Sequence, residues 1–191
     1  MEKEMTASEL QEKGIRILCF DAFSYFLKNL KDYPGNYLEI GVFEGFSLRE
    51  LAKAYPEKMF YGVDPFIEDG HTTGHNGVPK GERMEAQREA TYRNIEGIQN
   101  INFFEFKSRE WEIYHLDNSQ VKAMNISGVL VDGDHSYEEC SNDIKIAIRC
   151  LNHGGVIWID DQGLSGVKRA VEEVQHHERF IGKIGDMVFI K

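Results

Sequence analysis

The segment Tyr37-Leu-Glu-Ile-Gly-Val-Phe-Glu-Gly45 is an apolar, strand-like run that breaks into a loop with glycines at positions 41 and 45. Gly41 permits a sharp turn or a positive φ angle, and Gly45 lets a ligand approach the backbone closely. Residues with helical spacing follow at Ser47–Ala54. A strand, a glycine turn and a helix in this order predict the start of a βαβ unit.

The alternation of strand-like and helix-like segments continues along the chain. Runs that are apolar on both faces indicate strands covered from both sides, and the helices between them indicate right-handed βαβ units around a parallel sheet. The expected strands are Tyr37–Val42, Met59–Val63, Ile101–Phe106, Ile126–Val131 and Gly155–Ile159. The expected helices are Ser47–Ala54, Glu82–Ile95, Trp111–Lys122, Tyr137–Leu151 and Val167–His176.

The C-terminal region departs from this alternation. Two strand-like runs, Arg179–Ile184 and Met187–Ile190, are joined by Gly185-Asp186, a dipeptide that fits a tight hairpin turn. The sheet is therefore expected to end in an antiparallel pair. The predicted fold class is α/β, with a doubly wound, mostly parallel seven-stranded sheet and an antiparallel edge hairpin.

The chain has 191 residues, which predicts a single domain over residues 1–191. Thr6-Ala-Ser-Glu9 has capping-box spacing, and the apolar residues after it predict a helix that runs to Leu30. Residues 1–34 are thus expected to form an N-terminal helical extension. A homodimer built through this helix is a further expectation.

Composition restricts the classes of partner. The net charge of −10 disfavours a phosphate backbone, so nucleic acid is not an expected partner. No apolar run approaches the ~18 residues that span a bilayer, and Met1–Leu10 is charged where a signal peptide would be apolar. The three cysteines have no metal-like spacing, and we therefore expect a reduced, cytoplasmic protein without membrane contact.

An acidic residue accompanies the glycine loop. Asp64 closes the second expected strand 19 residues after Gly45, which suits a hydrogen bond to ribose hydroxyls; the alternative is a glycine turn beside a solvated Asp. The glycine spacing is G-x-x-x-G rather than G-x-G-x-x-G, and Glu39 and Glu44 would repel a pyrophosphate. An adenosine ligand with a cationic, amine-bearing arm fits better. S-adenosylmethionine has that shape and charge.

These residues carry a resemblance to a known family. Glu39-x-Gly41-x-Phe43-x-Gly45 resembles motif I of class I S-adenosylmethionine-dependent methyltransferases, and Asp64 resembles their acidic ribose ligand. Val131–Glu138 and Gly154–Asp161 resemble the group of macrocin O-methyltransferase and the cephalosporin hydroxylase-like proteins. The resemblance implies a Rossmann-like methyltransferase fold and O-methylation of a hydroxylated small molecule of the sugar or secondary-metabolite type. The implied cofactor-binding residues are Glu39, Gly41, Phe43, Gly45, Asp64, Ser108 and Asp132.

Several carboxylates follow the fourth and fifth expected strands. In a doubly wound sheet the first and fourth strands are neighbours at the switch point, where ligands bind beyond the carboxyl ends. Converging carboxylates repel one another, and a hard divalent cation such as Mg²⁺ or Ca²⁺ relieves that repulsion. Asp132, Asp160 and Asp161 are therefore the predicted metal ligands. The alternative is that Asp132 and Asp160 cap strand ends or helices without a metal.

His135 lies three residues after the first of these predicted ligands. An imidazole with an ordinary pKa of ~6.5 suits a general base, and the resemblance points to the same role. The alternative is a structural cap on the helix that follows. His135 is the predicted catalytic residue, which would take the proton from the acceptor hydroxyl.

Other features leave alternatives open. Pro65–Gly81 is a long polar stretch that forms either a lid over the cofactor or a plain loop, and its His71 and His75 are expected to be solvated. Trp158 is expected in the core, and Trp111 either in the core or near the adenine. The rival functions are a non-catalytic S-adenosylmethionine-binding module and a hydroxylase-like or nicotinamide enzyme on the same fold.

Overall fold

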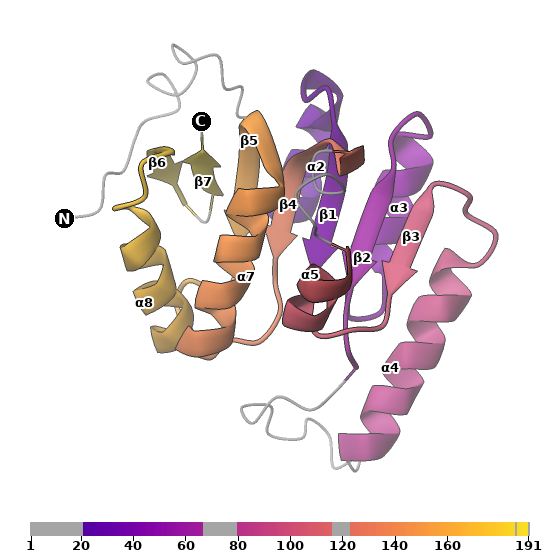
Figure 1. Ribbon diagram of the computed structural model, residues 1–191. Coiled ribbons are helices and arrows are strands. Elements are labelled where there is room, and N and C mark those ends of the chain that lie inside the picture. The colour runs from indigo at the N-terminus through magenta and orange to yellow at the C-terminus, as the bar shows by residue number, and fades with distance from the viewer. Residues whose placement is uncertain (1–20, 67–79, 116–122, 186, 191) are drawn as a thin grey trace.

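The computed structural model describes residues 21–66, 80–115, 123–185 and 187–190. Within these ranges, helices lie on both faces of one seven-stranded sheet (Figure 1). The strands are β1 Asn36–Ile40, β2 Phe60–Val63, β3 Ile101–Phe104, β4 Ile126–Val131, β5 Leu151–Ile159, β6 Phe180–Ile184 and β7 Met187–Ile190. The helices are α2 Ala22–Asn29, the short 3₁₀ helix η1 Leu30–Asp32, α3 Phe46–Ala54, α4 Lys80–Ile95, α5 Ser108–His115, α7 Tyr137–Cys150 and α8 Ser165–Val174.

The strand order is β3-β2-β1-β4-β5-β7-β6, in which β1 to β5 run parallel and β7 is antiparallel to both β5 and β6. The predicted doubly wound sheet with its antiparallel edge hairpin is confirmed. Ile40 pairs with Val63 on β2 and with Val131 on β4. Because these three strands end at the same level, the loops that follow them begin side by side at one edge of the sheet.

Each face of the sheet has its own core. Along β1, Tyr37 packs with Phe26 of α2, with ring centroids 4.9 Å apart, whereas Leu38 belongs to the opposite cluster under α5, α7 and α8. Figure 1 shows the two layers, with α2 and α3 behind the sheet and α5, α7 and α8 in front of it. Trp158 and Trp111 are buried on opposite faces, as expected for core residues.

Several element boundaries differ from the sequence prediction. The helix expected from Thr6 to Leu30 is wrong at Asp21, because that residue has extended backbone and its carboxylate accepts a hydrogen bond from the Ser24 N–H at 2.8 Å. Asp21 therefore caps a helix that begins at Ala22. α5 begins at Ser108 rather than at Trp111, and β5 begins at Leu151 rather than at Gly155.

Some expectations lie outside the described residues. Most of the Pro65–Gly81 stretch, with His71 and His75, is in this group, as is the capping box at Thr6. Among the helices that the structure describes, none has the length and apolar character needed to cross a bilayer.

Candidate functional site at the carboxyl edge of the sheet

Three of the four non-glycine residues with left-handed backbone in the described part of the chain follow the carboxyl ends of parallel strands. Phe43, Phe66 and Asp161 have φ angles of 53°, 47° and 54°, and they follow β1, β2 and β5 respectively. A non-glycine residue keeps such a conformation only where its surroundings impose it, and residues of this kind cluster at functional sites. The carboxyl edge of the sheet is therefore the candidate ligand site.

Gly41 brings the β1–α3 loop directly against the end of β4. Its φ angle is +86°, and a Cβ atom added to it would lie 2.0 Å from the carbonyl oxygen of Asp132. The Ile40 carbonyl accepts the Asp132 N–H at 2.8 Å, and the Gly41 N–H donates to the Val63 carbonyl at 2.9 Å. Only glycine fits this contact, so the expected meeting of the glycine loop with the Asp132 segment is confirmed.

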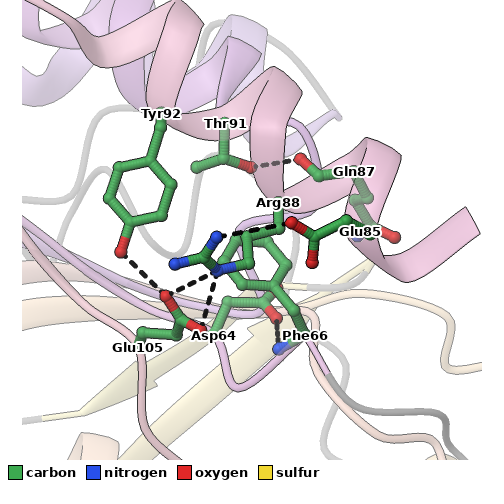
Figure 2. Close-up of polar contacts among 8 residues, drawn as sticks. All are labelled: Asp64, Phe66, Glu85, Gln87, Arg88, Thr91, Tyr92 and Glu105. Atoms are coloured by element: carbon green, nitrogen blue, oxygen red, sulfur yellow. Dashed lines mark hydrogen bonds and ion pairs between the residues drawn. The ribbon is translucent and has the colours of Figure 1, made fainter. Parts of the chain in front are cut away.

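Asp64 organises the glycine loop from the end of β2. Its Oδ2 accepts the N–H groups of Val42 and Phe43 at 2.8 and 3.1 Å, and its Oδ1 accepts the N–H of Phe66 at 2.8 Å. Figure 2 shows the last of these contacts. A carboxylate has about four acceptor positions, so one remains beyond these three bonds. Binding of a ribose hydroxyl by Asp64 stays a prediction, and it would use the remaining acceptor position of the carboxylate.

Glu39 lies behind the loop, within the sheet, and only 2% of its surface is exposed. Its carboxyl accepts hydrogen bonds from the hydroxyls of Ser47 at 2.5 Å and Tyr37 at 3.2 Å. The pKa of Glu39 is raised to about 8, chiefly by burial and also by the nearby carboxylates of Asp132 and Asp64, against the lowering effect of the two hydroxyls. Glu39 is thus a largely protonated group near neutral pH, enclosed behind the loop and bonded to the two hydroxyls.

The neighbour of Gly45 is a helix. Gly45 has φ +72° and precedes α3, and a Cβ atom added to it would lie 3.2 Å from Thr91 Cγ2 and 3.4 Å from Ile95 Cγ2 of α4. The sequence analysis expected Gly45 to let a ligand approach the backbone closely. In the structure its Cβ direction is filled by α4. Phe43 in the same loop is 64% exposed.

A second group of polar side chains faces the loop from the ends of β4 and β5. Asp132, His135 and Asp161 each offer a ligand atom, and these atoms lie within 4.8 Å of one another. His135 Nε2 is 3.1 Å from Asp161 Oδ2. Partial burial and the charges of Asp160, Asp161 and Asp64 raise the pKa of Asp132 to about 7, although its side chain still reaches solvent. Carboxylates that repel one another in this way are poised to accept a cation or a proton.

Asp160 differs from the expected arrangement. Its Oδ1 accepts the N–H of Asp161 at 2.9 Å, and it is not among the three side chains whose ligand atoms converge in the described part of the chain. Its charge nevertheless acts on Asp132, so it lies near the group. The structure therefore adds His135 to the predicted Asp132–Asp161 pair and leaves Asp160 at its margin.

The backbone around His135 is fixed on two sides. Asp134 Oδ1 accepts the Ser136 N–H at 2.7 Å, and Ser136 caps α7 through the Glu139 N–H at 3.3 Å. A Cβ atom added to Gly166 of α8 would lie 2.3 Å from the His135 carbonyl oxygen. The sequence analysis did not single out Gly166, because nothing in its local sequence indicates that α8 starts against this loop.

Ser108 begins α5, and its hydroxyl donates to Asp143, a buried carboxyl on α7. Burial raises the pKa of Asp143 to about 7, and the Ser108 hydroxyl opposes that shift. An adenine contact by Ser108 stays a prediction, since its hydroxyl is engaged with Asp143 in this structure. Asp143 was missed by sequence reasoning, although an acidic residue next to the apolar Ile144 and Ile146 is a usable signal.

The strand order, the glycine turn and the acidic group at the switch point define a class I methyltransferase fold. Residues 38–162 match the family model described as "Methyltransferase domain", and the chain belongs to that family.

The chain is also similar to a curated relative and to solved structures. An uncharacterized protein, R132, of Acanthamoeba polyphaga mimivirus is 26% identical over an alignment of 147 residues, which covers 73% of this chain and 60% of that protein. The O-methyltransferase TomG from Streptomyces achromogenes, solved in complex with SAM, has a TM-score of 0.61 at 15% identity, over 97% of this chain and 87% of its own. The O-methyltransferase NovP has a TM-score of 0.58 at 17% identity, over 88% and 77% respectively. At these identities the solved structures show the fold.

Proposed function

We propose that this protein binds S-adenosylmethionine at the carboxyl edge of the sheet and methylates a hydroxyl oxygen of a small molecule, with help from a divalent cation. The observation that carries the proposal is the meeting of the Gly41 loop with Asp132, within a group that also holds His135 and Asp161. Membership of the methyltransferase family and the fold of the O-methyltransferases TomG and NovP support it. A sugar or secondary-metabolite acceptor is the finer expectation.

The residues at the edge fit a cationic nucleoside. Asp64 presents a carboxylate on the loop side, and Asp132 and Asp161 lie at the neighbouring strand ends, which disfavours a pyrophosphate and favours a ligand with a positive charge. The cofactor-binding residues of the proposal are Glu39, Gly41, Phe43, Gly45, Asp64, Ser108 and Asp132.

The donor set also fits a divalent cation. Asp132 and Asp161, with Asp160 at the margin, supply carboxylate oxygens. The pKa of Asp132 is raised by burial and by repulsion from these neighbouring carboxylates, and a cation would relieve the repulsion. The cofactor supplies an electrophilic methyl group, and a bound cation lowers the pKa of the acceptor hydroxyl. A carboxylate set favours Mg²⁺, Ca²⁺ or Mn²⁺, and it leaves the His135 imidazole for proton uptake.

His135 is the proposed general base. Its imidazole takes the proton of the acceptor hydroxyl on a ring nitrogen, and the positive charge that results lies next to Asp161, whose Oδ2 is 3.1 Å from Nε2. Gly166 and the Ser136 cap hold the backbone on either side of the imidazole. The chain's own contribution is therefore positioning and proton uptake.

Two measurements test the proposal. Calorimetry with S-adenosylhomocysteine, S-adenosylmethionine and NAD should show binding of the first two and none of NAD. Methyl transfer to a panel of glycosides and catechols, with Mg²⁺, Mn²⁺ or chelator, should then show cation-dependent product. Binding without transfer to any acceptor would favour the non-catalytic module, and binding of NAD alone would overturn the proposal.

A matched pair of variants assigns His135. His135→Ala removes the proposed base, and His153→Ala removes an exposed histidine near the start of β5, at the opposite edge of the sheet. Only the first should lose methyl transfer. Equal activity of the two variants would exclude His135 as the base.

A further inference from the structure

Two side chains of α4 hold the peptide groups of the glycine loop. The hydroxyl of Thr91 has two carbonyl acceptors, that of Phe43 at the shorter distance and that of Gln87 at 3.0 Å, and the Asn94 amide donates to the carbonyl of Glu44 at 2.7 Å. Thr91 is fully buried, with no exposed surface. The Asn94 amide oxygen accepts from Arg49 Nη1 at 2.8 Å, which fixes the orientation of the amide so that its NH₂ points to the loop.

The loop residue Phe43 is held at both of its backbone polar groups. Its N–H donates to Asp64 at 3.1 Å, and its carbonyl accepts from Thr91. This residue has a positive φ angle, which an L side chain adopts at a cost. The contacts on both sides of the residue explain why the conformation persists. They also show that the shape of the loop depends on α4.

α4 is anchored to the sheet independently of the loop. Arg88 Nε contacts both carboxylate oxygens of Glu105, just after β3, at 2.9 and 3.0 Å, and the Tyr92 hydroxyl donates to the same carboxylate at 2.8 Å. Figure 2 shows Arg88 and Tyr92 converging on Glu105 while Thr91 lies on the same helix. The Arg88 guanidinium also lies 5.1 Å from the centre of the Tyr92 ring. A helix fixed at β3 can hold a loop that follows β1.

We infer that Thr91 and Asn94 are positioning residues for the cofactor: they act through the carbonyls of Phe43 and Glu44 to keep the loop in its binding conformation. The inference rests on the proposed function, because it assumes that the loop receives S-adenosylmethionine. Gly45 contributes to the same contact, because the absence of a Cβ atom lets Thr91 and Ile95 of α4 approach the loop. Cofactor affinity thus depends in part on α4, which holds the loop through hydrogen bonds from Thr91 and Asn94.

Binding of S-adenosylhomocysteine, measured by calorimetry, tests the inference. Thr91→Val keeps the shape of the side chain and removes the donor, so the affinity should fall about 3- to 10-fold, the range expected for one net hydrogen bond. Thr91→Ser restores the donor and should bind within about twofold of the wild type. Under saturating cofactor the methyl-transfer rate of Thr91→Val should stay within about twofold, because the effect is on binding.

Asn94→Asp provides a second variant on an accessible part of the helix. It keeps the acceptor for Arg49, removes the donor to Glu44, and should weaken binding of S-adenosylhomocysteine by a similar factor. Asn102→Asp, which makes the same change at an exposed position on β3, is the matched control and should bind normally.

The outcomes separate the two claims. Affinities of Thr91→Val and Asn94→Asp equal to that of the control would overturn the inference while leaving the proposed function intact, as would a Thr91→Ser variant as weak as Thr91→Val. Failure of the wild-type protein to bind S-adenosylhomocysteine would overturn the proposed function, and with it this inference.

Discussion

Replacement of Gly41 by alanine should destabilise the protein far more than the same change at a glycine with a similar backbone and free space. A Cβ atom at position 41 would lie 2.0 Å from the Asp132 carbonyl oxygen, whereas one at Gly97, with φ +76°, would meet nothing within 4 Å. The pair therefore separates the cost of the backbone conformation from the cost of the contact.

The magnitudes follow from the structure. Left-handed backbone destabilises an alanine variant by about 1–2 kcal/mol. The lower conformational entropy of its unfolded chain stabilises it by about 0.4–1 kcal/mol. The free energy of unfolding of Gly97→Ala should therefore be lower by about 1 kcal/mol. At Gly41 the two backbones must also separate by about 1 Å, which breaks the bonds from Asp132 N–H to Ile40 and from Gly41 N–H to Val63, at about 1 kcal/mol each. The expected total for Gly41→Ala is about 3 kcal/mol.

Urea unfolding followed by tryptophan fluorescence measures both variants, since Trp111 and Trp158 are buried on opposite faces of the sheet. The Tm of Gly41→Ala should fall by about 6–12 °C in a chain of this length. If the two variants lost stability equally, within about 0.5 kcal/mol, the close contact between the β1–α3 loop and the end of β4 would be refuted.

Three further predictions concern the site. Burial raises the pKa of Glu39 from 4.5 to about 8, so the stabilisation from its protonated form is complete below about pH 4.5 and is lost as the pH rises through about 8. Urea titrations should therefore show that the free energy of unfolding declines over that range, and declines less in Glu39→Gln. Equal pH dependence in the two proteins would contradict the shift. His135→Ala should lower methyl transfer about 10²–10⁴-fold with nearly unchanged affinity for S-adenosylhomocysteine in calorimetry, whereas a loss of affinity alone would point to a structural role. Asp161→Asn should weaken Mg²⁺ binding more than about tenfold, measured calorimetrically with S-adenosylhomocysteine present, and Asp160→Asn should weaken it less. A larger effect of Asp160→Asn would instead favour Asp160 as a ligand, as the sequence predicts.

The sequence predicts the sheet well because its strands are covered on both faces. Ile126–Val131 is apolar at nearly every position, and the structure places β4 over the same residues. Asp21 shows where periodicity fails. Apolar residues recur at roughly helical spacing on both sides of it, yet its carboxylate caps the N–H of Ser24, a local bond that competes with the continuing helix.

The site was predictable where the fold rules place it and not where long-range contacts form it. The switch-point rule brings Gly41 and Asp132 together because β1 and β4 are neighbours. The partners of Ser108 and Thr91 lie 35 and 48 residues away in the chain, and no local spacing reveals them. The grouping of His135 with Asp161 likewise depends on how two loops from different strands are oriented.

The order of the last two strands bears on how the protein is made. β7 follows β6 in the chain but lies between β5 and β6 in the sheet, with Met187, Val188 and Phe189 fully buried. Since a chain leaves the ribosome N-terminus first, β6 emerges before the strand with which it pairs. β6 must therefore wait for the strand after it, and a chain truncated before Met187 would leave β5 and β6 without the neighbour that they share.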